Sequence, residues 1–282
     1  MAEGKSARKH RLATVAVWSA ATALSLGTVV FGGIASATTP SSIAVGAKPT
    51  IVLEHGAFAD ASSWDGVIKR LRADGYPVVA PANPLRGPAS DAAALRSVID
   101  HIPGPKILVG HSYGGSVISE AGANDPQVKA LVYVAAFLPA PGETALELTG
   151  KFPGSTLGNT LDPVTYKLPD GTSTTDLYIR ADAFRHQFAA DVPAGQAALM
   201  AATQRPIAQS ALQEPAKVAA WQEKPSWDVV TTEDLNIPEA AQLYMAQRAH
   251  AHVTEVAASH SVAVSRPATV AGVIEEAARA TR

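Results

Sequence analysis

The sequence contains no cysteine among its 282 residues. Disulfide bonds, zinc sites with thiolate ligands and cysteine nucleophiles are therefore excluded. Charged residues are also scarce: they make up 17% of the chain, whereas soluble domains usually contain roughly 25%. The formal net charge is only −2. A nucleic-acid-binding protein normally carries a basic patch or stripe, so this balance argues against nucleic acid as a partner.

Residues 1–37 differ in composition from the rest of the chain. Four basic residues precede an uncharged run over 12–34, and residues 35–37 read Ala-Ser-Ala. A basic start, an apolar stretch and a small-residue cleavage site are the parts of a secretory signal peptide. We therefore expect a secreted or extracytoplasmic protein with no membrane attachment after cleavage. The alternative is an uncleaved anchor, because the uncharged run is long enough to span a bilayer.

The polar residues 38–48 are expected to form a linker, and 49–282 an α/β domain. Apolar runs rich in β-branched residues alternate there with helical segments, which implies right-handed crossovers and a mostly parallel sheet. The first two helices are expected to be capped by Ser62 or Ser63 and by Ser90. Strands are predicted at 51–53, 77–80, 106–109, 128–134, 227–231 and 252–256, and helices at 62–73, 90–101, 112–123, 238–250 and 266–280.

The alternation stops between about residues 139 and 225, which predicts an inserted cap. This stretch contains a turn signal at Pro169-Asp170-Gly171, typical of a hairpin. Two helical segments are expected after it, at about 181–191 and 194–212.

The motif Gly110-His111-Ser112-Tyr113-Gly114 directly follows a predicted strand and opens a predicted helix. A strained turn in this context exposes a serine hydroxyl, and the flanking glycines let neighbouring backbone approach closely. We therefore predict that Ser112 is a nucleophile.

A serine nucleophile needs a histidine base and a carboxylate that orients it. His260 follows the last predicted strand by four residues, at the edge where open α/β sheets assemble their sites. Glu233 and Asp234 follow the strand before it, and the shorter side chain and position of Asp234 favour it. Asp228 is interpreted as a surface residue at the start of that strand. His250 and His252 have no third ligand close in sequence and are not expected to bind a metal.

The oxyanion that develops during attack needs preorganised N–H donors. One is expected from Tyr113, at the start of the helix that follows the nucleophile. The second is expected from Ala57, because Gly56 permits a tight turn after the first strand.

Together these segments resemble the α/β-hydrolase superfamily, and within it the group of plant methylesterases, hydroxynitrile lyases and small bacterial esterases. The likeness covers nearly all of residues 49–282 and includes Ile51–Phe58, Gly110–Gly115, 224–238 and 259–262. It implies an α/β-hydrolase fold with a helical cap, no cofactor, and a triad of Ser112, Asp234 and His260.

Two positions separate the branches of this group. The hydroxynitrile lyases of the group carry threonine at the position of Gly56. They also carry a lysine at the position of Ser261, and its positive charge stabilises the departing cyanide. The resemblance therefore favours ester hydrolysis. Glu54 departs from the apolar residue that relatives usually have, so it must be paired, hydrogen-bonded or protonated, and a structural partner is expected.

The sequence thus predicts a secreted serine hydrolase that cleaves small-molecule carboxylic esters without metal or cofactor. Acyl transfer, perhydrolysis or carbon–carbon cleavage at the same site, and a non-catalytic protein that binds a small ligand, are the alternatives. The oligomeric state is left open. The residues expected to line the substrate pocket are apolar and lie near the motifs or in the cap: Phe58, Phe137, Leu138, Phe184, Phe188, Leu199 and Met200.

Overall fold

The computed structural model describes residues 48–282 of the chain. The expected signal segment 1–37 and nearly all of the expected linker 38–48 lie outside the described residues. None of the helices that the structure describes has the length and apolar character needed to cross a bilayer.

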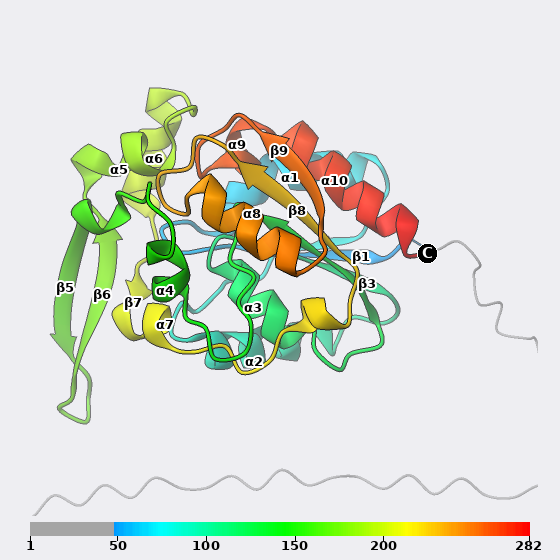
Figure 1. Ribbon diagram of the computed structural model, residues 1–282, viewed down its shortest axis with the longest axis horizontal. Coiled ribbons are helices and arrows are strands. Elements are labelled where there is room, and N and C mark those ends of the chain that lie inside the picture. The colour runs from blue at the N-terminus through cyan, green and yellow to red at the C-terminus, as the bar shows by residue number, and fades with distance from the viewer. Residues whose placement is uncertain (1–47) are drawn as a thin grey trace, which may run out of the picture. The chain divides into compact units, whose positions relative to one another are not determined.

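A six-stranded sheet forms the centre of the molecule (Figure 1). All of its strands are parallel, in the order β2-β1-β3-β4-β8-β9, which confirms the predicted α/β fold. Because the strands are parallel, their carboxyl ends meet at one edge, where sites of open α/β sheets form. The strands are β1 (Thr50–Glu54), β2 (Val78–Val79), β3 (Lys106–His111), β4 (Val128–Val134), β8 (Ser226–Thr231) and β9 (His252–Val256).

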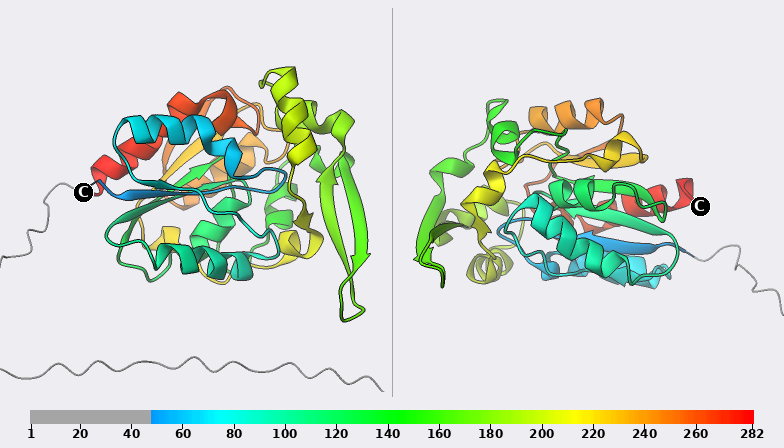
Figure 2. Two further views of the ribbon diagram at one scale, coloured as in Figure 1. Left: turned by 180° about the vertical axis from the view of Figure 1, so that it is seen from behind. Right: turned by 90° about the horizontal axis from the view of Figure 1, so that it is seen from below.

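Helices cover both faces of this sheet, as the two views in Figure 2 show. Alternate side chains of a strand face opposite layers: Val52 and Leu108 pack with α2, α3 and α8, whereas Ile51 and Ile107 pack with α1, α9 and α10. Burial on both faces explains why these strands read as continuous apolar runs. The bounds are α1 (Asp65–Ala73), α2 (Pro88–Ile99), α3 (Gly114–Ala121), α8 (Glu239–Arg248), α9 (Val262–Ser265) and α10 (Pro267–Ala280).

The segment between β4 and β8 forms the cap, beside the central sheet in Figure 1. It contains a small antiparallel sheet in the order β5-β6-β7, whose long hairpin turns at the predicted Pro169-Asp170-Gly171. Its elements are α4 (Ala145–Gly150), β5 (Leu161–Lys167), β6 (Ser173–Ile179), α5 (Ala181–Phe188), α6 (Ala194–Thr203), β7 (Ile207–Ala208), α7 (Gln209–Gln213) and two short 3-10 turns, Leu157–Asn159 and Ala220–Gln222.

Some local predictions were wrong. The single helix expected at 194–212 is two helices separated by β7, because Pro206 cannot donate an intrahelical hydrogen bond and disfavours helical backbone before it. Asp60, not Ser62 or Ser63, caps the first helical segment, which begins as the 3-10 turn Ala61–Trp64. The second helix begins one turn earlier than expected, so its N-cap residue is Gly87 and not Ser90.

The interpretation of Asp228 as a surface residue was also wrong. Asp228 lies in β8, between Tyr133 of β4 and Val253 of β9, and its side chain is fully buried. Neither carboxyl oxygen has a hydrogen-bond partner within residues 48–282. Burial raises the pKa of Asp228 well above its usual range, so the carboxyl group keeps its proton in the folded protein.

This buried acid predicts a stability that falls as pH rises. The folded state holds the proton of Asp228 after the unfolded chain, with an ordinary carboxyl pKa of about 3.9, has released it. As the pH rises above about 5, the free energy of unfolding should therefore decline more steeply in the native chain than in Asp228→Asn. The difference in slope is at most about 1.4 kcal/mol per pH unit. Urea unfolding across this range measures it.

Glu255→Gln is the control, because it neutralises an exposed carboxylate on the neighbouring strand β9. If Asp228→Asn and Glu255→Gln show the same dependence of stability on pH, Asp228 is not protonated in the folded protein.

Candidate active site

Ser112 occupies a sharp turn between β3 and α3. Its φ is +52°, in the left-handed region that residues other than glycine rarely adopt. The main chain around it is fixed: its N–H donates to Val134 O at 3.2 Å, and its carbonyl accepts from Gly115 N at 3.0 Å and Phe137 N at 3.1 Å. Strain held in place by surrounding hydrogen bonds is typical of functional sites. The side chain lies at the carboxyl edge of the sheet, with the residue 7% exposed.

The loop after β1 packs directly against this turn. A Cβ atom on Gly56 would lie 2.6 Å from Ser112 Cβ and 2.8 Å from the His111 carbonyl oxygen. Both separations are shorter than any van der Waals contact, so a side chain at position 56 would force the two segments apart. Glycine is therefore required here for close approach and not for its backbone angles.

His260 and Asp234, which sequence reasoning paired, are in contact. His260 Nδ1 lies 2.6 Å from Asp234 Oδ2, and both side chains are almost completely buried. Glu233, the alternative acid, is exposed. Four further donors hold the Asp234 carboxylate: the main-chain N–H groups of Asn236 and Ile237, Thr231 Oγ1 and Gln242 Nε2, at 2.7 to 3.2 Å.

The His260 ring lies next to the turn that carries Ser112. Its centroid is 4.8 Å from the ring of His111, the residue immediately before Ser112. Since Nδ1 faces Asp234, the nitrogen left for a serine is Nε2. No hydrogen bond joins Ser112 Oγ to His260 Nε2 among the residues that the structure describes. Contacts between a nucleophile and its base are often long in free enzymes and tighten when substrate binds.

His111 anchors the loop that carries His260, a role that sequence reasoning missed. Burial, and secondarily the nearby His260, lowers the pKa of His111 to about 3, so its ring is neutral. His111 Nε2 lies 2.9 Å from the main-chain oxygen of His260 and must carry the proton that it donates there. The ring of Phe188 packs against both histidines. The sequence shows His111 only as the variable position of a motif.

The two residues expected to supply oxyanion donors line the same cavity as Ser112. They are Ala57 and Tyr113, and neither main-chain N–H donates to an acceptor within the described part of the chain. The loop that bears Ala57 is held by His55: its Nε2 accepts from Asn83 N at 2.9 Å, which leaves Nδ1 to donate to Gly56 O at 2.9 Å. The tether fixes the direction of the loop before any substrate arrives.

The Tyr113 side chain is held by a buried carboxylate that the sequence does not reveal. Its hydroxyl donates to Asp91 Oδ2 at 2.7 Å, and the same oxygen accepts from the main-chain N–H groups of Arg86 and Gly87. Burial, and then the charge of Asp91, raises the pKa of Tyr113, so the phenol keeps its proton and stays a donor.

Glu54, at the end of β1, is 1% exposed. We expected a hydrogen-bonding partner for this carboxyl group, but Glu54 Oε2 has none among the described residues. Burial, and secondarily the charge of Asp91, raises the pKa of Glu54 well above its usual range. Of the three states that sequence reasoning allowed for this carboxyl group, protonation is the one that fits.

A cavity of about 90 Å³ opens beside Ser112. Of the residues predicted to line a pocket, Phe58 and Phe137 do line it, together with Ala57 and Tyr113. Its other walls come from residues that sequence reasoning did not single out: Leu146, Thr149, Leu157, Gly158, Leu161, Leu212, Asn236 and Ile237.

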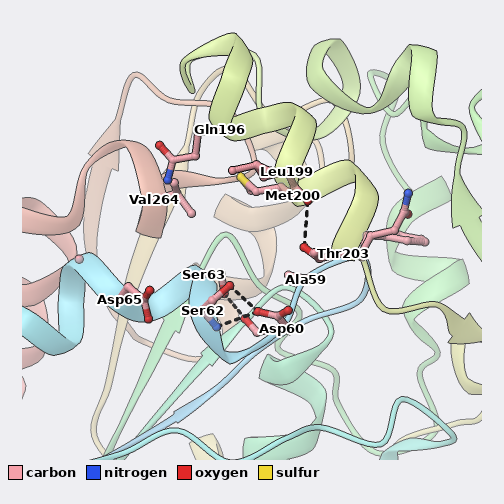
Figure 3. A pocket seen from close by; sticks show the side chains of 13 residues that line it. Ala59, Asp60, Ser62, Ser63, Asp65, Gln196, Leu199, Met200, Thr203 and Val264 are labelled. Carbon is pink, nitrogen blue, oxygen red and sulfur yellow. Dashed lines mark hydrogen bonds between the residues drawn. The ribbon is translucent and has the colours of Figure 1, made fainter.

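Leu138, Phe184 and Phe188 do not line this cavity, contrary to expectation. All three belong to the buried core. Phe184 and Phe188 are there because α5 turns its apolar face inward. Leu199 and Met200 line a different cleft of about 290 Å³, between α6 and the loop after β1. Figure 3 shows both side chains across this cleft from Asp60 and Ser62.

Residues 51–273 match the Alpha/beta hydrolase family, and the chain belongs to that family. An alpha/beta hydrolase of Aspergillus novofumigatus is 26% identical over 252 residues, which are 82% of this chain and 97% of the relative. The crystal structure of a pyrethroid hydrolase from Sphingobium faniae superposes with a TM-score of 0.66 at 25% identity, covering 82% of this chain and 98% of that one. A methylesterase from Arabidopsis has a TM-score of 0.68 at 20% identity, over 82% and 99% of the two chains.

These comparisons confirm the resemblance drawn from the sequence, since the family match covers most of the chain and the relatives include a bacterial pyrethroid hydrolase. They identify the chain as a hydrolase among relatives named as hydrolases and esterases.

The contact between Tyr113 and Asp91 predicts a measurable loss of stability. Tyr113→Phe removes one donor from a buried carboxylate, which should lower the free energy of unfolding by about 1–2 kcal/mol. Urea unfolding measures the change. Tyr178→Phe is the matched control, because the Tyr178 hydroxyl makes no hydrogen bond within residues 48–282. Equal stability of the two variants would show that the hydroxyl of Tyr113 does not support Asp91.

Proposed function

We propose that this protein is a serine hydrolase that cleaves carboxylic esters through an acyl-enzyme intermediate. The observation that carries the proposal is the 2.6 Å contact of His260 Nδ1 with Asp234 Oδ2, beside a serine in a strained turn. In the attack, His260 Nε2 accepts the proton of Ser112 Oγ as that oxygen bonds to the acyl carbon. The same proton then passes to the alcohol oxygen, which leaves as the ester bond breaks.

The second half-reaction reverses these roles. His260 accepts a proton from water, the resulting nucleophile attacks the acyl carbon, and Ser112 leaves with that proton as the acid is released. In both halves, the N–H groups of Ala57 and Tyr113 stabilise the charge on the carbonyl oxygen. Asp234 keeps the proton of His260 on Nδ1 and stabilises the imidazolium.

Ester hydrolysis is favoured over the lyase reaction of the same group. Position 261, where the lyases carry a lysine for cyanide, is a buried serine whose hydroxyl donates to Phe188 O at 2.8 Å. No cation therefore stands directly after His260 to stabilise a departing cyanide. The pyrethroid hydrolase among the structural relatives supports the ester reaction.

Export also belongs to the proposal. It is supported by the basic, apolar and small-residue pattern of residues 1–37 in the sequence alone.

The first test is the rate of p-nitrophenyl acetate hydrolysis by Ser112→Ala. The variant should lose activity by at least about a thousandfold, because the nucleophile is gone while binding and the oxyanion donors remain. A fluorophosphonate probe should label the native chain at Ser112, located by mass spectrometry, and should not label the variant.

The matched control is Ser116→Ala, which removes a buried serine from α3, the helix that directly follows the Ser112 turn. Undiminished turnover by Ser112→Ala, or an unlabelled Ser112 in the native chain, would overturn the assignment.

The second test concerns the space at position 56. Gly56→Ala should lower kcat/KM by about a hundredfold. The added Cβ would lie 2.6 Å from Ser112 Cβ, so Ser112 would have to shift relative to the oxyanion N–H groups of Ala57 and Tyr113. Gly272→Ala is the control, since a Cβ there meets no atom within 4 Å. Circular dichroism verifies that both variants fold. Near-native activity in a folded Gly56→Ala would show that this close approach is not needed for catalysis.

A further inference from the structure

A second, larger cavity lies in the cap next to the one at Ser112. It has a volume of about 370 Å³. Four residues line both: Leu146, Gly158, Leu161 and Leu212. Because the two cavities are neighbours with four walls in common, we take them as the inner and outer parts of one groove between the serine and the β5–β6 hairpin. We call it the cap groove.

The walls of the cap groove carry no charge. Its outer part is built by α4, α7 and the β5–β6 hairpin, with Pro163 and Leu177 beyond the shared residues and only Gln209 and Gln213 as polar side chains. Leu146 is 52% exposed, so its side chain is accessible to a ligand in the groove. Without a charged partner, an ionised chain would lose solvation here and gain nothing, whereas an alkyl chain would be favoured.

Phe58 stands between the Ser112 cavity and a second, chemically different cleft. This residue lines both the Ser112 cavity and the cleft of Figure 3. Its φ is +61°, its N–H donates to Arg205 O at 2.9 Å, and its ring packs edge-on against Phe188. These contacts hold the ring as a wall. The cleft behind it carries Asp60 and Asp65, so it is also chemically unlike the cap groove.

The position of His260 indicates which arm of an ester enters the groove. The leaving alcohol oxygen receives its proton from His260, so the alcohol arm must lie towards that ring. His260 does not line the cavity, whereas both oxyanion donors, Ala57 and Tyr113, do. The arm in the cavity is therefore the one on the far side of the carbonyl, which is the acyl arm.

We propose that the cap groove binds the acyl chain, and that the preferred substrates are uncharged esters with an extended apolar acyl group. This inference rests on the proposed function. Each methylene that enters the groove should raise kcat/KM by about fourfold until the outer end is reached.

The experiment compares two series of substrates. One lengthens the acyl group, from p-nitrophenyl acetate through butyrate and hexanoate to octanoate. The other lengthens the alcohol, from methyl to octyl acetate. The native chain should show a rising kcat/KM in the acyl series and a flatter response in the alcohol series.

Leu161→Trp narrows the groove where its two parts join, and Gln213→Trp narrows its exposed outer end. Leu161→Trp should lower the ratio of kcat/KM for octanoate to that for acetate by at least about tenfold. Gln213→Trp should lower this ratio less. Because Gln213 is exposed, this variant keeps the test valid if Leu161→Trp does not fold. Leu199→Trp is the matched control, since Leu199 is 69% exposed and lines only the cleft beyond Phe58.

The outcomes separate the inference from the proposed function. Acetate hydrolysis that depends on Ser112 but shows no gain with acyl length would overturn the groove and leave the esterase standing. A chain-length ratio that responds to Leu199→Trp and not to Leu161→Trp, or a response confined to the alcohol series, would also overturn it. Absence of any Ser112-dependent hydrolysis would contradict the proposed function itself.

Discussion

The parallel pairing of the strands is the constraint on which the site depends. Ser112, Asp234 and His260 lie far apart in the sequence, and each follows the carboxyl end of a strand: β3, β8 and β9. Because β4 alone separates β3 from β8, and β9 pairs with β8, these three ends open on one edge of the sheet. A single antiparallel strand among them would have sent one of the residues to the opposite edge.

A second layer of contacts turns this proximity into a fixed arrangement. Neutral His111 ties the Ser112 turn to the His260 loop, His55 ties the Ala57 loop to Asn83, and Asp91 holds Tyr113. The first two contacts join loops that follow different strands, and the third joins α2 to the turn after β3. Ser112 and Phe58 both have positive φ values, which cost energy, and main-chain hydrogen bonds to Val134, Gly115, Phe137 and Arg205 hold them there.

The positions at the carboxyl edge were predictable from the sequence because they follow from topology. A strand, a turn motif and the end-of-strand rule suffice to choose Ser112 and His260, and the shorter acid Asp234 over Glu233. Residues such as Asp91, Gln242 and the side chain of His111 act through contacts across the fold, and no local pattern marks them. The prediction that Asp228 is exposed was wrong for a related reason. Sequence reasoning placed Asp228 at an exposed strand end, whereas β8 is an inner strand, paired with β4 on one side and β9 on the other.

The cap was the part of the fold that the sequence predicted least well. Its apolar residues serve two purposes that sequence alone does not separate: Phe184 and Phe188 pack the core, whereas Leu146, Leu161 and Leu212 line the groove. Both sets are large apolar residues, so composition does not distinguish them. What distinguishes them is burial: Phe184 and Phe188 are completely enclosed, whereas Leu161 and Leu212 pack against the edge of the core and Leu146 is 52% exposed. The sheet thus positions the candidate site, and the cap shapes the cavities beside it.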